Sequence, residues 1–398
     1  IADITGVYGI TFTILMINVT LFELYKYLIK KRNLPKQQII ITGVLLLTFY
    51  CYGIIRTFNV KNIENKARPI KIGSIQPCTP LVSKDRIKQE RNIRLKVFKM
   101  TEELLKKHRI DILIWPESAA QFIYKSPEFM DAYRKPIEEF VKKYKVYFIF
   151  SDIEKTLWGI NRKGILEEYI PFLPNSNAQY RSLRELRIKY YSTAVLLDRD
   201  ANIIGNYRKN YPLAFAEYMP LSETFPFLKT IFAEVGDFSA GDTITVFKTD
   251  LCNFAPSICY EIIIPSFTRK FLLQDSNLII NLTNDAWFGD TRASHEHLSL
   301  ALFRAIENRV PIVRATNSGI STCISATGTF TVPPTETFTD ATIVSEVKPI
   351  KIWSFYTKMG DVFGYIVLIA GIFLFVFGHY LRFKETGKIW FIRLKRKW

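Results

Sequence analysis

Long apolar segments without charged residues are the most prominent pattern along the chain. Three of them, Ile4–Phe22, Ile39–Ile55 and Val362–Leu381, contain no Lys, Arg, Asp or Glu. A helix needs about 20 apolar residues to cross a bilayer, with roughly 17 as the lower limit. The pattern therefore predicts three transmembrane helices, and a buried core helix is the alternative for the second and third segments. No basic stretch precedes the first segment, so it does not read as a signal peptide.

The chain between the second and third apolar segments alternates short apolar runs with amphipathic ones. The expected strands are Ile70–Ile75, Asp111–Trp115, Val146–Phe150, Thr193–Leu197, Ile203–Tyr207, Thr243–Phe247, Asn277–Leu282 and Ile320–Ser325. An apolar stripe at helical spacing runs from Ile93 to Leu104, and further helices are expected over 126–145 and 294–308. The segment Asp198–Asn202 predicts a hairpin turn. Strands with intervening helices and a hairpin indicate an α/β fold with a mixed sheet covered by helices.

Positive charge is concentrated beside the apolar segments. The formal net charge is +17. The clustered basic residues are Lys26, Lys30, Lys31, Arg32, Lys36, then Arg382, Lys384, Lys388, Arg393, Lys395, Arg396 and Lys397. Basic residues next to a span favour the cytoplasmic side, so the segment from about Thr57 to Lys358 is expected on the outer side. Nucleic-acid binding is not expected, because none of its usual motifs occurs.

Composition narrows the class of protein further. Hydrophobic residues make up 48% of the chain and aromatic residues 14%, which argues against disorder. The five cysteines are Cys51, Cys78, Cys252, Cys259 and Cys323. They are scattered without a CxxC pair, and only four histidines occur, so no zinc site or disulfide framework is indicated. We therefore expect neither a metal nor an organic cofactor.

Three places combine a predicted strand end with a reactive side chain. Glu117 follows a hydrophobic strand that stops at a proline, at the kind of strand end where active sites of α/β folds collect. Lys209 follows another strand, with Glu217 eight residues later in an apolar loop. Cys259 lies beside a turn and is flanked by Glu261, so a neighbouring base could activate it as a nucleophile. Taken singly, the alternatives are a solvated glutamate, a surface lysine and an inert buried cysteine.

In this order, the three residues resemble the Glu-Lys-Cys triad of the nitrilase superfamily. The surrounding motifs are similar to those of its apolipoprotein N-acyltransferase branch. The matching motifs are Trp115-Pro116-Glu117-Ser118, Phe215-Ala216-Glu217-Tyr218, Cys259-Tyr260-Glu261, residues 281–290 (NLTNDAWFGD), His295-Glu296-His297 and residues 314–319 (RATNSG). Residues 2–9 and 356–361 also resemble segments near the last spans of that branch. The resemblance therefore covers essentially the whole chain.

The resemblance implies a nitrilase-like α-β-β-α sandwich domain inserted between transmembrane helices. Residues 1–58 would form two transmembrane helices, and residues 59–358 a periplasmic catalytic domain. Residues 359–398 would form a C-terminal transmembrane helix and a basic cytoplasmic tail. The branch carries additional spans, so we expect sequence upstream of Ile1. The expected location is the bacterial inner membrane, which the protein would cross several times.

The resemblance also implies a transfer reaction. Glu117 would act as the general base and Cys259 as the nucleophile. Lys209 and the backbone N–H of Tyr260 would stabilise the tetrahedral oxyanion. The acyl donor would be a membrane phospholipid, and the acceptor would be the N-terminal amine of a diacylglyceryl-cysteine apolipoprotein. A Cys259 thioester would link the two steps.

Supporting and substrate-binding roles are expected for several neighbours. Glu217 would orient the lysine, and Glu261 would line the site. Trp287, Phe288 and Tyr218, with apolar residues near the cysteine, would form part of a lipid-facing entrance. Ordinary core packing is the alternative for Trp287.

The chain departs from the branch pattern in three places. Ala216 replaces the usual glycine of its loop, the preceding residues 212–214 are permuted, and Gln76-Pro77-Cys78 lacks the usual asparagine. The rival enzyme reading is a nitrilase-type amidase acting on a small soluble amide. The predicted spans argue against it, and so does the apolar run 262–264, where soluble amidases usually carry an arginine. The non-enzyme rival is a membrane-anchored binding or scaffold protein with a vestigial triad.

Overall fold

The chain forms two compact units. The computed structural model describes residues 1–30, 33–80, 86–120, 124–160, 166–169, 187–233 and 235–386. One unit comprises Ile1–Phe58 with Trp353–Trp398, and the other comprises Asn59–Ile352. Part of the two basic clusters, namely Lys31, Arg32, Lys388, Arg393, Lys395, Arg396 and Lys397, lies outside the described residues.

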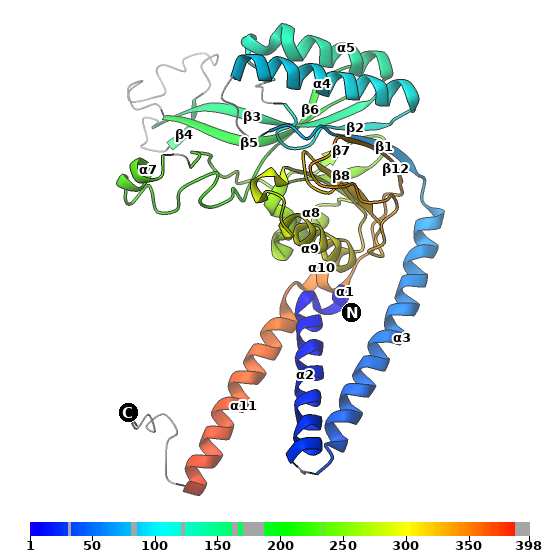
Figure 1. Ribbon diagram of the computed structural model, residues 1–398, viewed down its shortest axis with the longest axis vertical. Coiled ribbons are helices and arrows are strands. Elements are labelled where there is room, and N and C mark those ends of the chain that lie inside the picture. The colour runs from blue at the N-terminus through cyan, green and yellow to red at the C-terminus, as the bar shows by residue number, and fades with distance from the viewer. Residues whose placement is uncertain are drawn as a thin grey trace. The chain divides into compact units, whose positions relative to one another are not determined.

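The first unit is helical. Its elements are α1 (Ala2–Thr5), α2 (Val7–Lys30), α3 (Lys36–Lys66, which continues into the second unit), α10 (Phe355–Met359) and α11 (Val362–Thr386). The helices α2, α3 and α11 (Figure 1) are long and apolar enough to span a membrane. Few of the side chains in their apolar windows are buried. The alternative of buried core helices is therefore wrong. Gly6 separates α1 from α2 at a φ of 62°, where a Cβ would lie 2.6 Å from the Tyr356 ring.

The second unit contains two mixed sheets. The first sheet has the order β12-β1-β2-β3-β5-β6, with β4 paired to β3. Its strands are β1 (Ile70–Gln76), β2 (Ile112–Ile114), β3 (Tyr147–Ile160), β4 (Leu166–Tyr169), β5 (Arg187–Leu197), β6 (Ile203–Arg208) and β12 (Ala341–Val347). The central strands β1, β2 and β3 are parallel, and the others pair antiparallel.

The second sheet has the order β11-β10-β9-β8-β7. Its strands are β7 (Phe247–Lys248), β8 (Asn253–Ile258), β9 (Leu278–Thr283), β10 (Ile312–Thr316) and β11 (Thr322–Ile324). The three central strands β8, β9 and β10 are parallel. Every residue of the parallel strands β9 and β10 is buried, as expected of parallel strands that are covered on both faces.

Helices cover the outer face of each sheet. They are α4 (Arg86–Lys107) and α5 (Lys135–Tyr144) on the first sheet, and α8 (Pro265–Leu273) and α9 (Ala293–Asn308) on the second (Figure 1). Successive side chains of β3 point to opposite faces of the first sheet, so the strand packs against the second sheet on one face and against helices on the other. Tyr147 and Ile149 pack between the two sheets, whereas Phe148 and Phe150 pack against α4 and α5. The predicted α-β-β-α sandwich flanked by apolar helices is therefore confirmed.

Two local expectations were wrong. Most of Thr243–Phe247 is not a strand, because the Thr243 carbonyl accepts a hydrogen bond from the Asn210 side chain instead of a neighbouring strand. The helix expected over 126–145 starts as a 3-10 turn (Pro127–Phe129) and a π turn (Met130–Arg134). Regular α-helix begins only at α5, where a proline in the first turn needs no N–H partner.

Candidate active site

Glu117 projects from the carboxyl end of β2. The preceding Trp115 fixes this strand end, because its backbone N–H donates to the Ile149 carbonyl and its buried indole Nε1 donates to Thr101 of α4 at 2.8 Å. Immediately after Glu117, Ser118 adopts a positive φ of 57°, which turns the chain sharply. The glutamate is therefore buried and held by a rigid strand end rather than by a solvated loop.

Lys209 follows β6 and is almost completely buried. Its backbone N–H donates to the Ser192 carbonyl, so the residue stays tied to β5. Its Nζ lies 2.8 Å from both carboxylate oxygens of Glu217 and 3.4 Å from Oε1 of Glu117. Glu217 is fixed in turn by the Leu213 backbone N–H, which donates to its second oxygen at 2.6 Å. The lysine is thus a buried cation shared by two carboxylates, not a surface residue.

Cys259 begins a 3-10 turn (Cys259–Ile263) at the carboxyl end of β8. It is buried and has a positive φ of 49°, a conformation that costs an L-residue about 1–2 kcal/mol. The Glu117 carboxylate lies close enough to the thiol that each group affects the pKa of the other. The structure therefore brings together the three side chains singled out in the sequence, each from a different strand end.

Glu261 ties the cysteine turn to the lysine loop. It is fully buried, and its carboxylate accepts hydrogen bonds from the N–H groups of Ile258 (2.8 Å), Asn210 (2.6 Å) and Tyr211 (3.2 Å). The Tyr207 hydroxyl donates to the same carboxylate at 2.6 Å. Burial raises the pKa of Glu261 to about 7 against the opposing effect of these donors. Glu261 was expected to line the site. Its carboxylate oxygens instead accept hydrogen bonds from backbone N–H groups around the site.

Electrostatics keep the resting cysteine protonated. Burial raises the pKa of Cys259 to about 12, the Glu117 carboxylate adds to this effect, and Lys209 opposes it. Burial also raises the pKa of Glu117. Although burial lowers the pKa of Lys209, its carboxylate neighbours more than offset this and raise it. Moving the thiol proton to Glu117 leaves the total charge of the cluster unchanged, whereas losing it to solvent would add a buried negative charge.

A second buried network lies behind the cysteine, and sequence reasoning assigned it no role. The Arg314 guanidinium donates to Asn281 at 2.7 Å and to Asp285 at 2.8 Å. Nδ1 of His297 lies 2.9 Å from the other oxygen of Asp285. All four side chains are buried. The available signal was Arg314 itself, because a charged residue inside an apolar strand must have buried partners.

The residues expected at a lipid-facing entrance differ in exposure. Trp287 is 58% exposed, so core packing does not explain it, and Phe288 is partly buried. Tyr218 and the Tyr260 side chain are also exposed, at 37% and 36%. Ile262 is fully buried in the core, so the cysteine turn itself contributes no apolar surface at that position.

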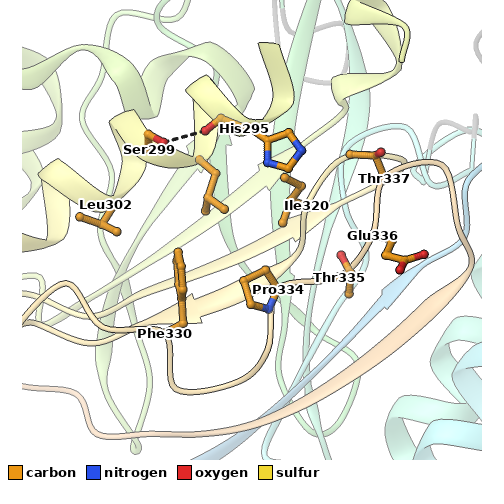
Figure 2. A pocket seen from close by; sticks show the side chains of 10 residues that line it. His295, Ser299, Leu302, Ile320, Phe330, Pro334, Thr335, Glu336 and Thr337 are labelled. Carbon is orange, nitrogen blue, oxygen red and sulfur yellow. Dashed lines mark hydrogen bonds between the residues drawn. The ribbon is translucent and has the colours of Figure 1, made fainter. Parts of the chain in front are cut away.

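Two pockets of the second unit differ in how close they lie to Glu117, Lys209 and Cys259 in the chain. A pocket of about 570 Å³ begins at Asn210, next to the lysine, and includes Tyr211 and Tyr218. A second hollow of about 660 Å³ lies between α9 and the segment 330–337, with Phe330 and Pro334 opposite Leu302 (Figure 2). None of the three clustered reactive residues lines this second hollow. Among the described residues, no group of His, Cys, Asp and Glu could hold a metal ion.

Comparison with known proteins decides the family. The model of the carbon-nitrogen hydrolase family matches residues 71–352. The chain belongs to the carbon-nitrogen hydrolase family. The match covers nearly the whole second unit, from β1 to its last residue, and it includes Glu117, Lys209 and Cys259. The resemblance predicted from the sequence motifs is therefore confirmed.

Similar full-length proteins point to one branch. The chain is 31% identical over 377 residues to the apolipoprotein N-acyltransferase of Geobacter metallireducens, a match covering 93% of this chain and 65% of the relative. It is 30% identical over 343 residues to that of Bdellovibrio bacteriovorus, covering 82% and 57%. The chain thus spans less than two thirds of either relative.

A solved structure, Nit3 of Saccharomyces cerevisiae, aligns with a TM-score of 0.48 at 16% identity, covering 74% of this chain and 95% of Nit3.

Proposed function

We propose that this protein transfers a fatty acyl group from a membrane phospholipid to the N-terminal amine of diacylglyceryl-cysteine apolipoproteins. The observation that carries the proposal is the buried cluster of Glu117, Lys209 and Cys259, which has a nucleophile, a base and a fixed cation within one site. The similarity to apolipoprotein N-acyltransferases supplies the substrate class.

In the first half-reaction, Cys259 attacks the ester carbonyl of the phospholipid while Glu117 takes the thiol proton. Lys209 and the backbone N–H of Tyr260 stabilise the oxyanion, an effect worth about 3–4 kcal/mol per donor in other hydrolases. When the intermediate collapses, the carbon–oxygen bond breaks, and Glu117 returns the proton to the leaving lysophospholipid. The acyl group then remains on Cys259 as a thioester.

In the second half-reaction, the amine of the apolipoprotein attacks this thioester. Glu117 removes the ammonium proton, the carbon–sulfur bond breaks, and the proton returns to Cys259 as the thiol is released. Glu217 positions Lys209 through both of its oxygens, and Glu261 holds the backbone of the cysteine turn. No step in this scheme calls on a metal or an organic cofactor.

The surface beside Lys209 supports a lipid substrate. The segment 211–232 of the second unit contains a concentration of exposed large apolar side chains. They are Tyr211, Phe215, Tyr218, Leu221, Phe225, Phe227, Ile231 and Phe232. Exposed apolar side chains gathered in one segment often mark a site that binds a partner, a membrane or a ligand. The pocket that begins at Asn210 shares Tyr211, Tyr218 and Leu221 with this set, so apolar side chains reach from the surface to the loop that carries Lys209.

The proposal includes a location. With three membrane-length helices and the basic clusters at Lys26–Lys36 and after Arg382, the positive-inside rule favours a multi-pass protein of the bacterial inner membrane. Residues 59–358 would then form the catalytic domain on the periplasmic side, between two spans at residues 1–58 and the last span at 359–398. Both proposed substrates are lipids of that membrane, so the reaction would occur at its outer surface.

The intact mass of a lipoprotein N-terminus tests the proposal. The full chain in vesicles is first given phospholipid alone, which should add one hydroxylamine-labile acyl mass to Cys259. Adding diacylglyceryl apolipoprotein should then clear the adduct and give triacyl product. Cys259→Ala should abolish both, and Glu117→Gln should slow adduct formation. Cys323→Ala is the matched control, because Cys323 is also buried and lies in β11 of the sheet whose strand β8 leads into Cys259, yet it should change neither step.

Two results would contradict the proposal. A Cys259→Ala protein that still makes triacyl lipoprotein would remove the thioester mechanism. An acyl adduct that is released only to water, together with hydrolysis of small amides, would favour the amidase alternative.

A further inference from the structure

The peptide bond between Cys259 and Tyr260 carries two polar groups, an N–H and a carbonyl, that have different partners. Its N–H belongs to Tyr260 and is the proposed backbone donor to the oxyanion. Its carbonyl belongs to Cys259. In a trans peptide the carbonyl and the N–H point in opposite directions. Whatever holds the carbonyl therefore also sets the direction of the N–H.

The Asn281 amide faces this carbonyl from the adjacent strand β9. Its Nδ2 lies 3.2 Å from the carbonyl of Ser257 and 3.5 Å from the carbonyl of Cys259. The buried Asn281 amide thus acts on the carbonyl side of the cysteine turn, opposite the proposed oxyanion.

Arg314 decides which way the Asn281 amide points. Its guanidinium donates to the amide oxygen at 2.7 Å, and a guanidinium can only donate, so the amide NH₂ must face the two carbonyls. Asp285 fixes Arg314 at 2.8 Å and His297 at 2.9 Å. Burial, followed by the Arg314 charge, lowers the pKa of His297 and so opposes protonation of the ring. The network is packed tightly, since a Cβ at Gly319 would lie 2.1 Å from an Asp285 oxygen.

We infer that Asn281, with Arg314 and Asp285 behind it, is a positioning residue that aims the Tyr260 N–H at the oxyanion. This inference rests on the proposed role of Cys259 as an acyl-accepting nucleophile. The positive φ of Cys259 is a strained conformation that persists only where its surroundings fix it. Glu261 fixes the N–H of Ile258 on one side, and Asn281 fixes the carbonyls on the other.

Two reactions of the same thiol separate this role from a merely structural one. Acylation by p-nitrophenyl butyrate passes through an oxyanion: the thiol proton goes to Glu117, the new carbon–sulfur bond forms, and p-nitrophenol leaves. Alkylation by iodoacetamide displaces iodide at a saturated carbon and forms no oxyanion. Loss of the N–H alignment should therefore slow the first reaction and spare the second.

The variants are Asn281→Ala and Asn281→Asp, measured in the full chain in detergent. The aspartate keeps the contact with Arg314 and turns an oxygen towards the two carbonyls, whereas alanine removes both contacts. Tm is measured for each variant, so a loss of folding is separated from a loss of alignment. Acylation should fall about 10- to 100-fold, less than the 100- to 1,000-fold typical of deleting an oxyanion donor, while alkylation of Asn281→Ala changes by less than about 3-fold. Asn308→Ala is the control, because Asn308 is a buried asparagine that donates to the Arg304 carbonyl of α9. It should lower Tm without changing the ratio of the two rates.

Each outcome bears on a different claim. Equal loss of acylation and alkylation, or no loss of either, would overturn the positioning role of Asn281. A wild-type protein that is acylated by the activated ester but never by phospholipid would remove the proposed function and leave the inference standing. A wild-type protein that is alkylated at Cys259 but is acylated by neither ester would overturn both.

Discussion

Replacing Lys209 with methionine removes the only cation that contacts the carboxylates of Glu117 and Glu217, as far as the described residues show. Methionine has a similar length, so the change deletes charge more than volume. Glu117 would lose a partner at 3.4 Å, and Glu217 would lose both of its 2.8 Å contacts. Removing one partner of a buried ion pair leaves an uncompensated charge and costs about 3–5 kcal/mol.

The protein can limit that cost by taking up a proton. Protonating a carboxyl of pKa about 4.3 at pH 7 costs about 1.36 kcal/mol for each of roughly 2.7 units, or about 3.7 kcal/mol. The two estimates agree. The free energy of unfolding of Lys209→Met should therefore be about 3–4 kcal/mol lower than that of the wild type at pH 7, which corresponds to a Tm decrease of roughly 6–15 °C. Burial raises the pKa of Glu117, and the Lys209 charge opposes that rise, so removing the charge raises the folded-state pKa of Glu117 further above its unfolded value. The loss of stability should therefore become smaller as the pH falls from 7.5 towards 5, where Glu117 takes up a proton.

Thermal melting in detergent from pH 5 to pH 7.5, together with the rate of Cys259 acylation, tests this reasoning. Acylation should fall about 100- to 1,000-fold at every pH, because one oxyanion donor is lost. Lys106→Met is the control, since Lys106 forms a solvent-exposed pair with Glu102 at 2.8 Å, and it should leave Tm and acylation unchanged. A Lys209→Met protein with wild-type Tm at pH 7, or with a deficit that grows on acidification, would refute the charge argument.

Three further predictions follow from the site and the spans. Because burial raises the pKa of Glu117, acylation should fall with acidification at a midpoint above the usual 4.5, whereas Glu117→Gln should give a slow, flat profile over the same range. Trp287→Ala should raise KM for phospholipid and leave Tm unchanged, because the side chain is 58% exposed; a lower Tm would indicate a packing role instead. A cysteine placed at the exposed Lys106 should react with a membrane-impermeant maleimide in spheroplasts, and labelling only after lysis would contradict the proposed orientation.

The spacing of apolar residues in the sequence predicted the layers of the fold better than it predicted the individual strands. The alternation in β3 and the stripe in α4 each depend on neighbours two to four residues away, so they are readable locally. The strand β8, which leads into Cys259, was missed. It contains Pro256, and proline argues against a central strand. The partner β7 pairs only with Asn253 and Phe254, so Pro256 lies beyond that pairing and its missing N–H is not needed there.

The three side chains that cluster in the structure could be singled out from the sequence because motifs accompany them, but their environment could not be predicted. Strand-end positions and flanking motifs singled out Glu117, Lys209 and Cys259 without any knowledge of distances. The network around Arg314 depends on contacts among β9, β10 and α9, which are distant in sequence and meet only after folding. The burial of Glu261 likewise arises from donors on another loop, and no local pattern reports them.

The charge balance of the site explains how one carboxylate can serve both proposed half-reactions. With Cys259 neutral at rest, the cluster contains two carboxylates and one ammonium, and burial opposes any further negative charge. Each half-reaction therefore moves a proton between Glu117 and the reacting groups without changing that total. Two carboxylates and one ammonium already leave one uncompensated negative charge. A preformed thiolate next to Glu117 would add a second one. The raised pKa of Glu117 then suits the cycle, because a base that is too weak could not accept the proton of a thiol or an ammonium group.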